Sequence, residues 1–124
     1  GQPRHRGEGL RLGTVRRPPR GVKKSDFAKR DYYDVWLPQL SPNADLVKDA
    51  LAAQKSGDAK AWQSFVKHFR AEMKESNASH LLDMLAALSH QADFSVGCYC
   101  EDEAHCHRSV LRDLLKERKA RFAD

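Results

Sequence analysis

The sequence has no long run of apolar residues and no feature typical of a secreted or membrane-bound protein. No stretch approaches the roughly 20 apolar residues that span a membrane, and the first residues contain no signal-peptide core. We therefore expect a cytoplasmic protein without membrane contact. The three cysteines are an odd number, so reduced thiols or a metal in a reducing compartment fit better than a disulfide framework.

The common catalytic and nucleotide-binding motifs are also missing. No Walker loop, HExxH or GxSxG sequence occurs, and Gly7-x-Gly9-x-x-x-Gly13 has the wrong spacing for a dinucleotide fingerprint. Counted from Cys100, the phosphatase loop C-x5-R is not formed, because the residue that should be arginine is Cys106. No motif identifies an enzyme class, so the sequence leaves open whether the chain is an enzyme.

The net charge of +5 is unevenly distributed along the chain. Residues 1–24 hold eight Lys and Arg against Glu8 alone, a net +7, whereas residues 25–124 hold fourteen bases and sixteen acids, a net −2. A basic arm on a nearly neutral body suggests contact with nucleic acid or another polyanion. A solvated, solubilising tail explains the same charge equally well.

The residue pattern predicts helices that separate short strands. Strands are expected over Leu10–Val15, Tyr32–Leu37 and Phe94–Cys100, and the last helix from about Asp102 to Lys119. The expected helix-boundary residues are Ser41 as N-cap before Pro42, Gly57-Asp58 between two helices, and Ser76 or Asn77 as the next cap. This order of elements favours a small single-domain α/β fold, with a short, mostly parallel sheet flanked by four helices.

The expected domain is residues 10–119, followed by a tail over 120–124. Residues 1–9 are expected to be a disordered basic arm, or a remnant of processing or expression, because the chain does not begin with Met. Trp62, Phe65, Val66, Phe69 and Met73 recur at helical spacing and are expected in the core. The strand Phe94–Cys100 has no charge on either face, which predicts a central strand covered on both sides.

The chemistry-bearing residues cluster around the start of the last expected helix. All three cysteines and two of the histidines fall within ten residues, and Arg108 follows them; the cluster is Cys98, Cys100, His105, Cys106 and His107. A helix N-terminus at the end of a strand attracts anions. Arg16, Arg17 and Arg20 would supply guanidinium groups for a phosphate, unless Glu101, Asp102 and Glu103 pair with those arginines instead.

Two other types of site remain open for the same cluster. Cys98, Cys100, Cys106 and His107 form C-x-C-x5-C-H, whose thiolates and imidazole suit zinc, although the spacing differs from that of standard zinc sites and Cys98 fits a core position. Alternatively, Cys106 at a helix start beside His107 is placed as a nucleophile, with Asp102 as a further catalytic candidate. The favoured expectation includes no cofactor, and zinc is the alternative.

The chain also resembles a known family over roughly Leu10 to Lys119. The shared marks are Arg16-x-x-Pro19-Arg20-Gly21, Asp34-x-Trp36 before Ser41-Pro42, Trp62-x-x-Phe65 with Phe69 and Glu72-Met73, and the strand leading to Asp102. In these it resembles the YeaO-like proteins, a bacterial and archaeal domain-of-unknown-function family. Val15, Pro18 and Cys106 depart from the YeaO branch, and Cys106-His107-Arg108 is closer to a sister branch. The resemblance implies a small α/β fold and no established activity.

Together these observations predict binding of a phosphate-bearing ligand or nucleic acid. The expected ligand-binding residues are Arg16, Arg17, Arg20, Cys100, His107 and Arg108, from the Arg16–Arg20 and Cys100–Arg108 loops. An enzyme with a Cys106, His107 and Asp102 active site, or a zinc-stabilised structural module, is the alternative. A monomer and a homodimer are both compatible with the sequence, because a small sheet can expose an edge strand that pairs with another copy.

Overall fold

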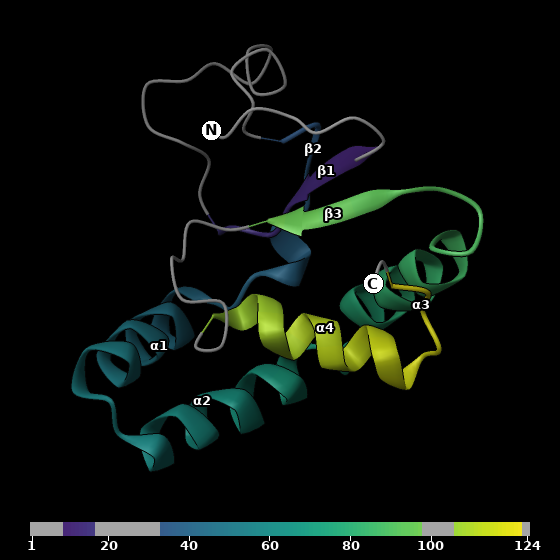
Figure 1. Ribbon diagram of the computed structural model, residues 1–124. Helices are drawn as coiled ribbons and strands as arrows, with labels where there is room; N and C mark the ends of the chain where they lie inside the picture. The colour runs from purple at the N-terminus through teal and green to yellow at the C-terminus, as the bar shows by residue number, and fades with distance from the viewer. Residues whose placement is uncertain (1–8, 17–32, 98–105, 123–124) are drawn as a thin grey trace.

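The computed structural model describes residues 9–16, 33–97 and 106–122. Within these ranges the chain forms strands, one short 3-10 helix and four α-helices (Figure 1). In order they are β1 (Leu10–Gly13), β2 (Val35–Trp36), η2 (Pro38–Leu40), α1 (Ala44–Ser56), α2 (Ala59–Glu72), α3 (Ser76–Leu88), β3 (Phe94–Gly97) and α4 (His107–Glu117). The elements confirm the predicted small α/β fold.

The sheet is parallel and three-stranded, in the order β2-β1-β3. Leu10 pairs with Phe94 and Gly13 with Gly97, while Leu12 also pairs with Val35 on the other side. In Figure 1 the four helices lie together on one side of this sheet. The prediction that the strand beginning at Phe94 is central is therefore wrong, since β1 is central and β3 lies at the edge of the described sheet. The outer face of this strand carries no charge because it is formed by Ser95 and Gly97. Both residues are nevertheless only partly buried, as suits an edge strand.

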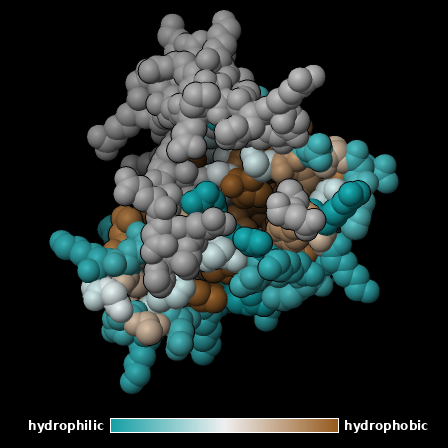
Figure 2. Space-filling model, viewed as in Figure 1, coloured by the Kyte–Doolittle hydropathy of each residue, from teal (hydrophilic) through white to brown (hydrophobic). Residues whose placement is uncertain are grey.

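The core lies between the sheet and the helices, as the apolar stripes predicted. Phe65, Phe69, Leu82 and Leu111 are among its most deeply buried side chains. Trp62, Phe65 and Phe69 stack along α2, with ring centroids 4.9 Å apart for the first pair and 5.7 Å for the second. Figure 2 shows hydrophilic side chains over most of the helical part on the face in view. Among the described residues, no helix is both long and apolar enough to cross a membrane.

The helix boundaries confirm one predicted turn. Gly57 ends α1 with a φ of 69°, a left-handed conformation that favours glycine. Asp58 then caps α2, because its carboxylate accepts a hydrogen bond from the Lys60 backbone N–H at 2.9 Å. This Gly-Asp pair therefore both stops one helix and starts the next.

Two predicted caps are wrong. The Ser41 hydroxyl donates to the Pro38 carbonyl at 2.6 Å, which closes η2, and Asn43 caps α1 instead by accepting from the Leu46 N–H at 2.9 Å. Glu75, rather than Ser76 or Asn77, occupies the cap position of α3 and forms no capping hydrogen bond. For the last helix, α4 begins at His107, and the predicted start at Asp102 lies outside the described residues.

The expected tail is partly in view, because residues 120–122 are described. The Ala120 N–H donates to the Leu115 carbonyl at 3.0 Å, and the Arg121 N–H donates to the Ser89 hydroxyl at 2.8 Å. The Phe122 ring lies 5.6 Å from the Arg112 guanidinium carbon. These residues thus contact α4 and the chain that follows α3.

Gly13 allows the closest approach within the sheet layer. A Cβ atom at this position would overlap the ring of Tyr33, a residue that is only 4% exposed. Gly97, its partner on β3, has open space, since a Cβ there would be 4.0 Å from the Leu12 carbonyl oxygen. The ring of Tyr33 therefore packs against the backbone of β1 where a side chain would otherwise lie.

We expect Gly13→Ala to lower the free energy of unfolding by about 1–3 kcal/mol, because the added methyl displaces a buried ring. Gly97→Ala is the matched control and should leave stability unchanged or raise it by up to about 1 kcal/mol, since it restricts the unfolded chain. Urea unfolding of both variants measures the difference. Equal stabilities would contradict the proposed Tyr33 contact.

Candidate functional site

The candidate site lies where β1 and β3 end and α4 begins. The Thr14 N–H continues the β1–β3 ladder by donating to the Gly97 carbonyl at 2.9 Å. Just beyond, His107 opens α4 and contacts the same Thr14. The carboxyl ends of parallel strands are the usual place for ligands in α/β sheets. The ends of β1 and β3 and the start of α4 therefore meet at one place.

His107 is held in one orientation by Thr14. Its Nε2 lies 2.6 Å from the Thr14 carbonyl oxygen and 3.2 Å from the Thr14 hydroxyl. A carbonyl oxygen only accepts hydrogen bonds, so Nε2 must carry the proton that it donates. The hydroxyl in turn donates to the Gly97 carbonyl at 3.1 Å, which leaves its oxygen able to accept from the imidazole.

The surroundings of His107 are largely apolar. The residue is 9% exposed, and its ring meets Phe69 edge-on, with centroids 5.9 Å apart and planes at 90°. This burial places His107 at the edge of the core. A polar ring buried in this way needs a hydrogen-bond partner, and Thr14 provides one.

Cys106 faces the other nitrogen of the same imidazole. It occupies the N-cap position of α4, is fully buried, and its Sγ lies 3.8 Å from Nδ1 of His107. Because Nε2 carries the proton in the neutral ring, the lone pair of Nδ1 is directed at the thiol. The result is a thiol–imidazole pair whose base is oriented by a third group, the Thr14 backbone.

Arg16 and Arg108 occupy different places relative to this pair. Arg108 lies in the first turn of α4 and is partly exposed, with its Nε atom buried. Arg16 follows β1, but its guanidinium donates to the carbonyls of Pro42 at 3.0 Å and Ser41 at 3.1 Å. Arg16 therefore binds the segment that leads into α1.

The structure thus brings together part of the predicted set. Cys106, His107 and Arg108 lie at the start of α4, beside Thr14, which the sequence analysis did not select. Arg16, also predicted, is instead bonded to Ser41 and Pro42. The remaining predicted members lie outside the described residues: Arg17, Arg20, Cys98, Cys100, Asp102 and His105. The one sequence sign of Thr14 was its place at the carboxyl end of an expected strand.

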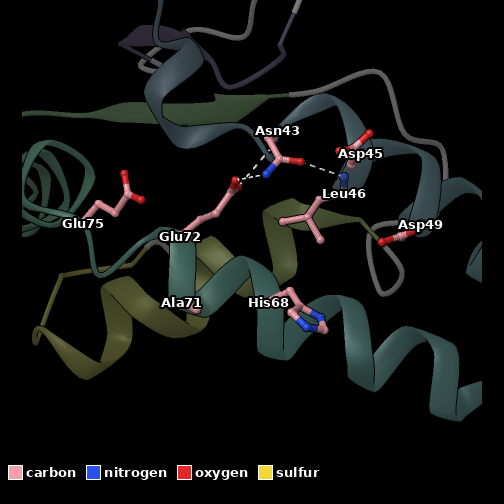
Figure 3. Close-up of a pocket in the computed structure, with 8 residues that line it drawn as sticks. All are labelled: Asn43, Asp45, Leu46, Asp49, His68, Ala71, Glu72 and Glu75. Atoms are coloured by element: carbon pink, nitrogen blue, oxygen red, sulfur yellow. Dashed lines mark hydrogen bonds between the residues drawn. The ribbon is translucent and has the colours of Figure 1, made fainter.

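A second polar feature lies between α1 and α2 (Figure 3). Glu72 on α2 accepts hydrogen bonds from the backbone N–H of Asn43, at 3.1 Å, and from its side-chain amide. The groove beside this contact has a volume of about 440 Å³ and is also lined by Asp45, Asp49 and His68. Within the described parts of the chain, no group of three or more His, Cys, Asp or Glu is arranged to hold a metal. Two of the predicted zinc ligands, Cys98 and Cys100, lie outside those parts.

The fold and this site define a class: a small α/β protein with a candidate site at the carboxyl end of a parallel sheet. Comparison with protein families gives the finer assignment. The model of the family described as the active DUF488-N3 subclade matches residues 1–119, so the chain belongs to this family. The match does not single out the YeaO-like branch suggested by the motifs. Searches of curated proteins and of solved structures give no match.

We expect Thr14→Val to lower the free energy of unfolding by about 1 kcal/mol, because it removes the hydroxyl that bonds Gly97 and His107 but keeps the side-chain shape. Chemical unfolding measures the change. The control is Ser64→Ala, an exposed hydroxyl on α2, which should stay within about 0.5 kcal/mol of the unmodified chain. Equal effects of the two substitutions would show that the Thr14 hydroxyl adds no stability.

Proposed function

We propose that the chain binds a phosphate-bearing ligand at the amino end of α4. The observation that carries the proposal is the junction at Thr14, which joins the carboxyl ends of β1 and β3 to His107 in the first turn of α4. This junction holds the helix start against the sheet edge, so its geometry is fixed before a ligand arrives. A preformed site loses less entropy when it binds.

The charge at this helix start favours an anion. No acidic residue lies in the first turn of α4, and the Cys106 side chain makes no capping hydrogen bond there. The first N–H groups of a helix carry partial positive charge, and Arg108 adds a guanidinium in the same turn. In this proposal Arg17 and Arg20 supply further cations, as their place after β1 in the sequence predicts.

Among phosphate-bearing ligands, the charge distribution along the chain favours nucleic acid. The net +7 of residues 1–24 contrasts with the −2 of the rest of the chain, so cationic groups are concentrated in the segment that includes β1. Contacts with phosphates release counterions, and binding that depends on them weakens steeply as salt rises. A basic arm would then add affinity without reading the base sequence.

The test is binding of a fluorescently labelled single-stranded oligonucleotide to the full chain, measured by anisotropy over a series of salt concentrations. We expect affinity to fall linearly with salt on logarithmic axes. Arg108→Ala should weaken binding about tenfold or more, since a charge-assisted hydrogen bond is lost, and Arg17→Ala with Arg20→Ala should weaken it further. The control is Arg112→Ala, one turn along α4. Salt-independent binding, no binding, or equal effects of Arg108 and Arg112 would refute the proposal.

A thiol-based active site is the second candidate, and the Cys106–His107 geometry favours it. With Nε2 held by Thr14, the Nδ1 atom can accept the Cys106 proton across 3.8 Å. A nucleophile beside an oriented base is the common arrangement for covalent catalysis. The family is described as an active subclade, which agrees with a catalytic role.

The rate of thiol alkylation in the native chain tests this second candidate. Because Cys106 is fully buried, a small reagent such as iodoacetamide is used, mass spectrometry follows each cysteine separately, and Cys106 should be alkylated despite its burial because His107 takes its proton. His107→Phe keeps a ring against Phe69 but removes the base, so Cys106 should then react several-fold more slowly. Slow and equal labelling of all three cysteines, or no effect of His107→Phe, would rule out an activated thiol.

A further inference from the structure

A smaller cavity lies away from the α4 site, where η2, α2 and α3 meet. Its volume is about 210 Å³. It is lined by Arg16, Gln39, Ser41, Glu72, Met73, Glu75, Asn77 and Ala78. Pockets for drug-sized ligands measure roughly 300–1,000 Å³, so a molecule that fits here is smaller.

Two opposite charges line this cavity without pairing with each other. Arg16 gives two hydrogen bonds to the carbonyls of Ser41 and Pro42, and guanidinium groups have five N–H donors. Glu75 makes no capping hydrogen bond at the start of α3. Within the described residues, the ion pairs are Arg70–Glu117 and Arg118–Asp83, so neither Arg16 nor Glu75 takes part in one.

The other carboxylate in the cavity is already engaged. Both oxygens of Glu72 accept hydrogen bonds from Asn43, the N-cap residue of α1, so Glu72 helps to hold the start of α1. Glu75 is therefore the acid that can receive a cation. Figure 3 shows the Glu75 side chain apart from the Glu72–Asn43 contact.

The rest of the lining suits a small organic molecule. Gln39 and Asn77 contribute side-chain amides, which donate to carboxylates, and Asn77 and Ala78 belong to the first turn of α3, where the helix dipole favours negative charge. Met73 and Ala78 are buried at 3% and 6% exposure and offer an apolar floor. An arginine and a carboxylate, neither in an ion pair within the described residues, thus both line one partly apolar cavity.

We propose that this cavity binds a small zwitterion of the α-amino acid class. The carboxylate of the ligand contacts Arg16 and the first turn of α3, the ammonium group contacts Glu75, and a short side chain lies over Met73. Both charges of the ligand are then matched, whereas a simple anion would meet Glu75 and a simple cation would meet Arg16. The proposal is independent of phosphate binding at α4.

The test is a chemical-shift titration of the ¹⁵N-labelled full chain with free L-alanine, L-serine, L-threonine and L-asparagine. At least one should shift the amide signals of Gln39, Ser41, Asn77 and Ala78 in a saturable way. The N-acetyl derivative lacks the cation and the amino acid amide lacks the anion, so each should bind at least tenfold more weakly. Absence of saturable shifts with all four amino acids would refute the proposal.

Two variants assign the ends of the ligand. Glu75→Gln should weaken binding of the amino acid at least tenfold and abolish its advantage over the N-acetyl derivative. It should leave the fold intact, because the Glu75 side chain forms no capping hydrogen bond and no ion pair with the described residues. Arg16→Gln should abolish the advantage over the amide. Asp113→Asn, an exposed acid on α4, is the control and should change nothing. If Glu75→Gln and Asp113→Asn behave alike, the ammonium site is not Glu75. Arg108→Ala, which tests the phosphate site, should leave these shifts unchanged.

Discussion

The structure of the candidate site depends on one buried hydrogen bond, from Nε2 of His107 to the carbonyl oxygen of Thr14 at 2.6 Å. It joins the first strand to the last helix across 93 residues of sequence. Because both groups are buried, loss of either partner would leave a desolvated polar atom. The same bond fixes the proton on Nε2, which decides that Nδ1, facing Cys106, is the basic nitrogen. One contact thus sets both the position of α4 and the chemistry available at its start.

A second set of polar contacts fixes the segment between the sheet and the helices. Arg16, just after β1, binds the carbonyls of Ser41 and Pro42, and Glu72 binds both amide groups of Asn43. Three consecutive residues are therefore held by side chains from two distant elements. These bonds position the start of α1 and, with it, the cavity between Arg16 and Glu75.

The sequence was most informative where local periodicity determines structure. The stripe of Trp62, Phe65 and Phe69 could only be buried if α2 forms, so its core position was predictable, as was the Gly57-Asp58 turn. The place of β3 was not, since small neutral residues such as Ser95 and Gly97 fit both a covered strand and an edge strand. The cap at Asn43 was missed because Ser41 is equally suited to capping, and only the tertiary contact with Glu72 decides between them.

The two proposed sites share a helix N-terminus, but the charged residues around each one determine which class of ligand it suits. Both lie at the amino end of a helix, where partial positive charge favours an anion. At α4 the first turn holds Arg108 and no acid, so the field there suits a phosphate. At α3 the cap position is Glu75, and Arg16, which follows β1, lines the same cavity. In this proposal a single carboxylate changes the preferred ligand from an anion to a zwitterion, and only the folded structure brings it into one cavity with an arginine that lies 59 positions earlier in the sequence.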